Sequence, residues 1–105
     1  MEYLGLAENS IENIENFPQL STLKHLDLNE NNLEKIAGLH QITSLIKLNL
    51  SGNQIVEVGH LPNLPSLEEL VLSSNLIQTL SHFPSLPNLL FVAVSYTHLT
   101  LPTKA

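Results

Sequence analysis

The chain has 105 residues, a net charge of −6, and neither cysteine nor arginine. Its hydrophobic content of 43% excludes a disordered chain, and 13% charged residues is too few for a coiled coil. Four lysines without clustered positive charge argue against binding to nucleic acid or to an anionic membrane surface.

From Met1 onward, the sequence falls into copies of one 22-residue unit. The complete copies span residues 1–22, 23–44, 45–66 and 67–88, and a partial fifth copy covers 89–94. One asparagine recurs at the same place in each complete copy, as Asn9, Asn31, Asn53 and Asn75. A fixed period of this size is typical of a solenoid, in which one supersecondary unit stacks on copies of itself. We therefore expect a single repeat domain over residues 1–94.

Each unit combines two hydrophobic periods. Around Leu26 and Leu28 the spacing is two, which predicts a strand of about three to five residues with one buried face. From Leu33 to Ile42 the spacing is three, which favours a 3₁₀-like or irregular return segment over an α-helix. Because every unit runs in the same direction, successive strands are expected to be parallel.

The repeated asparagine is predicted to be structural. It lies where the chain leaves the strand and turns inside the stack, a place where buried backbone amides need partners. Its side chain offers two donors and an acceptor, so it can bond turn backbone in its own coil and in the next. The alternative is an exposed turn residue, which four asparagines in register with flanking Leu or Ile disfavour.

Residues 23–33 match the pattern L-x-x-L-x-L-x-x-N-x-L at every position and resemble the leucine-rich repeat. The 22-residue length and the return pattern are similar to the short intracellular class, which includes the leucine-rich regulatory subunit of protein phosphatase 1. The resemblance implies an α/β-type leucine-rich repeat solenoid. Such a fold has a curved parallel β-sheet on its concave face and short 3₁₀ or irregular return segments on its convex face.

The strand residues between the leucines are the candidates for partner binding. They point away from the core, and equivalent residues of a parallel stack form rows about 4.8 Å apart. Candidate partner-binding residues are Tyr3, His25, Lys47, Glu69 and Phe91 in one row, and Asp27, Asn49 and Val71 in the next. Solenoid concavities serve as extended binding surfaces, and this mixture of side chains suits a protein partner. The alternative is a solvated face on which Lys47 and Glu69 only pair with each other.

Two other groups of residues are weaker candidates. His60 and His82 share one repeat position, but two histidines do not make a zinc site, so a surface histidine ladder is expected. Glu12, Glu15 and Glu34 are expected to form a solvated rim, with no nucleophile or pocket beside them. We therefore expect no enzyme, no metal and no cofactor.

From Val94 the repeat pattern breaks down, and Thr97 stands where a fifth asparagine is due. The string VSYTHLTLPT is similar to the translation of a sequencing-library adapter, so residues 95–105 are predicted to be a non-native tail. The alternative is a degenerate final repeat. Solenoid ends need polar caps, and neither end reads as one. A fragment of a longer protein, with poor solubility on its own, is therefore expected.

Two functions are consistent with these features. The first is a non-enzymatic protein–protein interaction module that binds through its concave face, with phosphatase regulation as a specific option implied by the resemblance. The alternative is a structural or targeting repeat segment of a larger multidomain protein, such as a ciliary or cytoskeletal one. The lack of cysteine and of a signal peptide in residues 1–10 favours a cytoplasmic or nuclear location.

Overall fold

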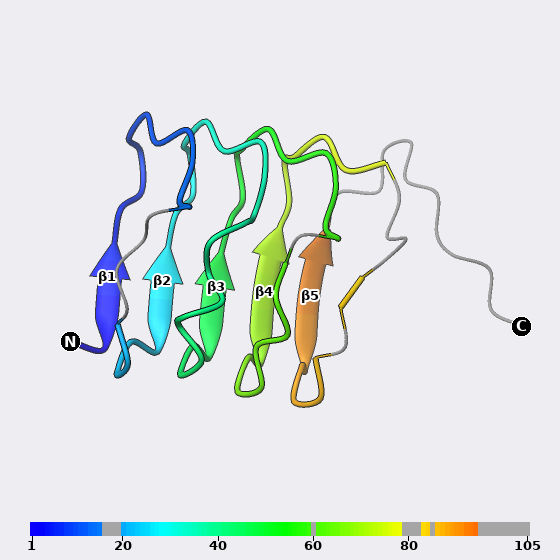
Figure 1. Ribbon diagram of the computed structural model, residues 1–105. Helices are drawn as coiled ribbons and strands as arrows, with labels where there is room; N and C mark the ends of the chain where they lie inside the picture. The colour runs from blue at the N-terminus through cyan, green and yellow to red at the C-terminus, as the bar shows by residue number, and fades with distance from the viewer. Residues whose placement is uncertain (16–19, 60, 79–82, 85, 95–105) are drawn as a thin grey trace, which may run out of the picture.

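The computed structural model of the chain is a solenoid of parallel strands, and it describes residues 1–15, 20–59, 61–78, 83–84 and 86–94. Its strands are β1 (Tyr3–Gly5), β2 (His25–Asp27), β3 (Lys47–Asn49), β4 (Glu69–Leu72) and β5 (Phe91–Val94). They form one sheet in the order β1-β2-β3-β4-β5, and every neighbouring pair is parallel. Figure 1 shows the five arrows side by side and pointing the same way. The expected parallel solenoid is confirmed.

β1 to β3 end one residue before the second leucine of the spacing, whereas β4 and β5 include that position. β2 (His25–Asp27) is centred on Leu26, and Leu28 lies just beyond the strand although it is fully buried. The reason is local: Asp27 Oδ1 accepts a hydrogen bond from Asn29 N at 3.1 Å, which begins the turn. Leu28 N still donates to Asn49 O of the next coil at 2.8 Å, so the hydrogen bonds between coils continue one residue beyond the regular strand.

The return segments are irregular, and their 3₁₀ character is limited to isolated turns. In the second coil, Ile42 N donates to Leu39 O at 3.1 Å and Leu45 N donates to Ile42 O at 3.3 Å, both across three residues. Backbone groups between such turns pair with other coils instead, as where Asn32 N donates to Ile11 O at 2.9 Å. Within the part of the chain that the structure describes, no helix has the length and apolar character needed to cross a bilayer.

The hydrophobic core runs along the solenoid and is best covered in its middle coils. In the second and third coils, the side chains at the return-segment positions have almost no exposed surface: Leu33, Ile36, Leu39, Ile42, Ile55, Val58, Leu61 and Leu64. Their counterparts Ile11, Leu20 and Leu86 in the outer coils are only half-buried. Phe17 and Leu80, which belong to the same pattern, lie outside the described residues. A middle coil buries its apolar residues against two neighbours, which is why stacking stabilises this fold.

The residue immediately before each repeat asparagine has a left-handed backbone conformation. The φ angles are 59° at Glu8, 56° at Glu30, 70° at Gly52 and 57° at Ser74. This conformation directs the backbone N–H toward the following coil, since Glu30 N donates to Ser51 O at 2.9 Å. Glycine adopts it without strain, whereas other residues incur a steric cost. The turn therefore favours glycine at a position where only one of four units has it.

Replacement of Glu30 by glycine should raise the free energy of unfolding by about 0.5–1 kcal/mol, because it removes the left-handed strain at a cost in unfolded-state entropy. The midpoint of urea unfolding, followed by circular dichroism, measures this change. The matched control is Glu34→Gly in a return segment, where no positive φ is relieved. That control should lower the midpoint. Equal destabilisation by both substitutions would contradict the prediction.

Candidate functional site

Asn53 shows how the repeat asparagine joins neighbouring coils. The residue is only 6% exposed. Its Nδ2 donates to Leu50 O (3.0 Å) and Ser51 O (3.2 Å) of its own coil, and to Leu28 O (3.0 Å) of the preceding coil. Its Oδ1 accepts a hydrogen bond from Leu33 N of the preceding coil at 3.0 Å. One side chain thus satisfies four backbone groups that would otherwise be buried without partners.

Asn31 and Asn75 repeat this pattern, each with three donated hydrogen bonds and one accepted. Each of these asparagines bonds the preceding coil. The sequence-based expectation that it would bond the next coil was wrong. The following coil is already bonded by the backbone N–H of the left-handed residue before the asparagine, as at Glu30 and Gly52. Asn9, in the first coil, is exposed, and among the described residues its side chain donates only to two carbonyls of its own coil. Thr97 lies outside the described residues.

A second row of side-chain hydrogen bonds was missed by sequence reasoning. Thr22 Oγ1 donates to Met1 O at 2.9 Å, and Ser44 Oγ donates to Leu23 O at the same step of 21 residues. The signal was available, because the last residue of the four units is Thr, Ser, Ser and Asn in turn. Thr22 and Ser44 thus tie the end of a return segment to the start of its own unit, whereas Asn88 Nδ2 donates to Pro65 O of the preceding unit at 2.7 Å.

The outward residues of the strands form the two expected rows. Strand register aligns Tyr3, His25, Lys47, Glu69 and Phe91 in the first row, and Gly5, Asp27, Asn49, Val71 and Ala93 in the second. We call these two rows the sheet face. The central leucines of β2 to β4 lie between the rows in sequence and are buried on the other side. The strand pleat thus separates core from surface, as the period of two predicts.

Side chains of the first row touch along the stack. The rings of Tyr3 and His25 meet edge to face, with centroids 6.2 Å apart and an interplanar angle of 71°. Lys47 Nζ lies 3.7 Å from Glu69 Oε2, and both side chains are about half exposed. The ion pair of the solvated-face interpretation is therefore present. The aromatic residues at the two ends of the row remain open, with Tyr3 60% and Phe91 53% exposed.

The sheet face is hollowed between β1 and β4. The hollow has a volume of about 190 Å³ and is lined by Tyr3, His25, Leu26, Asp27, Lys47, Leu48, Asn49, Glu69 and Val71. It therefore brings together seven of the eight sequence-predicted candidates and leaves out Phe91 on β5. Two of its polar residues are oriented by turns: Asp27 Oδ1 accepts from Asn29 N, and Asn49 Oδ1 accepts from Ser51 N, each at 3.1 Å.

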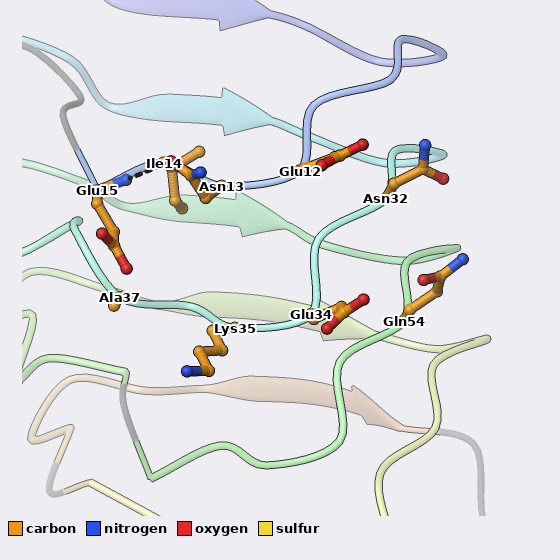
Figure 2. Close-up of a pocket in the computed structure, with 9 residues that line it drawn as sticks. All are labelled: Glu12, Asn13, Ile14, Glu15, Asn32, Glu34, Lys35, Ala37 and Gln54. Carbon is orange, nitrogen blue, oxygen red and sulfur yellow. Dashed lines mark hydrogen bonds between the residues drawn. The ribbon is translucent and has the colours of Figure 1, made fainter.

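A larger cavity of about 510 Å³ lies on the return side of the first three coils (Figure 2). Its lining residues are Glu12, Asn13, Ile14, Glu15, Asn32, Glu34, Lys35, Ala37 and Gln54. The expectation that no pocket accompanies the three glutamates was wrong, because neighbouring return segments leave a hollow between them. Figure 2 shows the Glu34 and Lys35 side chains directed to opposite sides of their segment. All of the charged residues here are exposed.

Metal-ligating groups do not converge in the described ranges: no cluster of three or more His, Cys, Asp or Glu there could hold an ion. The predicted ladder of His60 and His82 lies outside the described residues, as does the predicted non-native tail over 95–105.

The repeat geometry agrees with comparisons against known protein families. A family profile described as "Leucine rich repeat" matches residues 1–55, and one described as "Leucine Rich repeats (2 copies)" matches residues 43–88. The chain belongs to the leucine-rich repeat family. Among curated proteins, none matches it significantly. Leucine-rich repeats commonly mediate protein–protein interactions and are typically non-enzymatic.

Proposed function

We propose that this leucine-rich repeat chain is a non-enzymatic module that binds a protein partner through its sheet face. The observation that carries the proposal is the hollow over β1 to β4, where seven outward residues from successive coils line one surface. Exposed Tyr3 and Phe91 stand at the two ends of the first row. Exposed aromatic side chains are enriched in protein interfaces and often dominate the binding energy.

The cavity on the return side supports a binding role less well. Its charged side chains are exposed and come from two neighbouring return segments, and the Glu34 and Lys35 side chains point apart. Regulation of a protein phosphatase would be one specific form of the proposed function. It is motivated only by the similarity of repeat length and return pattern to the short intracellular class. The same similarity motivates a cytoplasmic or nuclear setting.

Substitution of Lys47 by Glu and Glu69 by Lys in one chain, together with Tyr3→Ala, should reduce partner capture roughly tenfold or more, since interface residues of this kind often dominate binding. The measurement is quantitative affinity capture with the full chain. The reciprocal exchange of Lys47 and Glu69 preserves an ion pair, so stability should change by less than about 1 kcal/mol.

The matched control exchanges charge on the return side, with Lys35→Glu and Glu57→Lys. That variant should retain every partner that the unmodified chain captures. If the sheet-face variant also retains all of them while its unfolding transition is unchanged, the proposal fails, and a structural or targeting role is favoured instead.

A further inference from the structure

We propose that the sheet face takes a partner segment in which a large apolar or aromatic side chain lies next to a positively charged one. This inference rests on the proposed function and specifies the chemistry of the partner. The apolar side chain would enter the hollow between β1 and β4, and the positive charge would meet the carboxylate of Asp27.

The charges at the hollow are not balanced. Among the described residues, the lysines of β3 and of the segment before β2 are already paired: Lys47 with Glu69, and Lys24 with Glu2, each at 3.7 Å. Asp27 lines the hollow and forms no ion pair with any described residue. One of its oxygens accepts the turn hydrogen bond, and a carboxylate retains further acceptor capacity. A partner therefore meets an uncompensated negative charge.

Two further acids extend this negative charge along the same edge of the sheet. Glu8 and Glu30 are exposed in the turns that follow β1 and β2. The Glu30 carboxylate lies over the backbone of Gly52, because a Cβ built on that glycine would be 2.5 Å from Glu30 Oε1. Neither acid forms an ion pair with a described residue. Clustered charge of one sign raises the local concentration of the opposite sign, so these acids favour a cationic partner.

The hollow itself has the size and lining for one side chain. Its volume of about 190 Å³ is smaller than the roughly 300–1,000 Å³ of small-molecule pockets, which favours a single anchor residue of a larger partner. Tyr3 and Val71 contribute apolar surface to it, and the Tyr3 ring is held edge-on against His25. Aromatic rings prefer such edge contacts or offset stacking, so a partner aromatic can extend the Tyr3–His25 pair.

Asn49 supplies an isosteric test of the charge. It occupies the position of Asp27 one coil later and accepts the same turn hydrogen bond, from Ser51 N at 3.1 Å. Asp27→Asn should therefore remove the negative charge and keep the turn. Asn49→Asp should add a negative charge to the hollow with the turn equally intact.

The experiment is a nuclear magnetic resonance titration of the ¹⁵N-labelled full chain with three capped tripeptides: Lys-Trp-Lys, Lys-Gly-Lys and Glu-Trp-Glu. Lys-Trp-Lys should shift the amide signals of His25, Asp27 and Lys47 and bind more tightly than the other two. Asp27→Asn should weaken its binding roughly two- to fivefold, and Asn49→Asp should strengthen it by a similar factor. Glu57→Gln, on the return side, serves as the control and should leave the affinity unchanged.

The possible failures separate this inference from the proposed function. If Glu-Trp-Glu binds the sheet face as tightly as Lys-Trp-Lys, or if Asp27→Asn changes nothing, the cationic partner is excluded while the binding face stands. If Lys-Gly-Lys binds equally well, the aromatic anchor is excluded. Shifts confined to the return side, around Glu12 and Glu34, would contradict both proposals. No shift with any of the three peptides would overturn this inference alone, because affinity capture tests the face independently.

Discussion

Replacement of Asn53 by alanine should lower the free energy of unfolding by about 3–5 kcal/mol, because it leaves several buried backbone groups without hydrogen bonds. Leu33 N loses its acceptor, and the carbonyls of Leu28 and Leu50 lose a donor. These groups lie between coils and are screened from water, so no solvent molecule replaces the amide easily. Typical domains have only about 5–15 kcal/mol of stability, and this single change should remove much of it.

The matched control for Asn53 is Asn9→Ala. Asn9 is exposed, and its side chain donates to two carbonyls of its own coil, so its loss should cost less than about 1 kcal/mol. Urea unfolding followed by circular dichroism measures both values, and amide hydrogen exchange at Leu33 reports the lost bond directly. Similar costs at the two positions would show that the asparagine acts within its own turn and does not join coils.

Gly38→Ala should lower the free energy of unfolding by about 2–6 kcal/mol, combining backbone strain with overpacking. Gly38 has a φ of 106°, which disfavours any residue with a Cβ. A Cβ there would also collide with the backbone of the first coil, at Ile14 O and at Glu15 Cα, the latter 2.7 Å away. Backbone atoms cannot rotate away as a side chain does, so the first coil would have to separate from the second. Thermal unfolding by calorimetry measures the loss.

Substitutions at two other glycines distinguish the contribution of backbone strain from that of overpacking at Gly38. Gly52 has a φ of 70°, but the three atoms nearest to its added Cβ all belong to the movable carboxylate of Glu30, so Gly52→Ala should cost about 1–2 kcal/mol from backbone strain. Gly5 has no positive φ, and its Cβ would lie 3.0 Å from the Tyr3 ring, which can shift. Gly5→Ala should therefore cost less than about 1 kcal/mol. If Gly38→Ala is no worse than Gly52→Ala, the close approach of the two coils does not constrain this position.

The register of the sheet face could be predicted from the sequence because the repeats have equal length. A constant step of 22 residues allows only one alignment of parallel strands that stacks leucine on leucine. Tyr3, His25, Lys47 and Glu69 then follow as neighbours with no further information, and the strand register confirms them. The position of the candidates in two rows on one face is a consequence of this alignment.

The left-handed turns could not be predicted, because their residue types vary. Glu8, Glu30, Gly52 and Ser74 share one backbone conformation and no common chemistry. At Glu8, Glu30 and Gly52 the conformation accompanies a backbone hydrogen bond to the following coil, which joins residues far apart in sequence. The asparagine side chain bonds the preceding coil, and not the next coil that was expected from its place in the repeat.

The sequence by itself therefore determined the repeat, the parallel sheet, the direction of each strand side chain and the place of the structural asparagines. Each of these follows from a regular spacing of residues, and such a spacing can be read directly from the sequence. Tertiary structure alone decided the direction of the asparagine bonds, the close packing at Gly38, the cavity on the return side and the hollow beside Asp27. These features depend on distances between neighbouring coils, which are set by side-chain volume and backbone geometry and leave no regular trace along the chain.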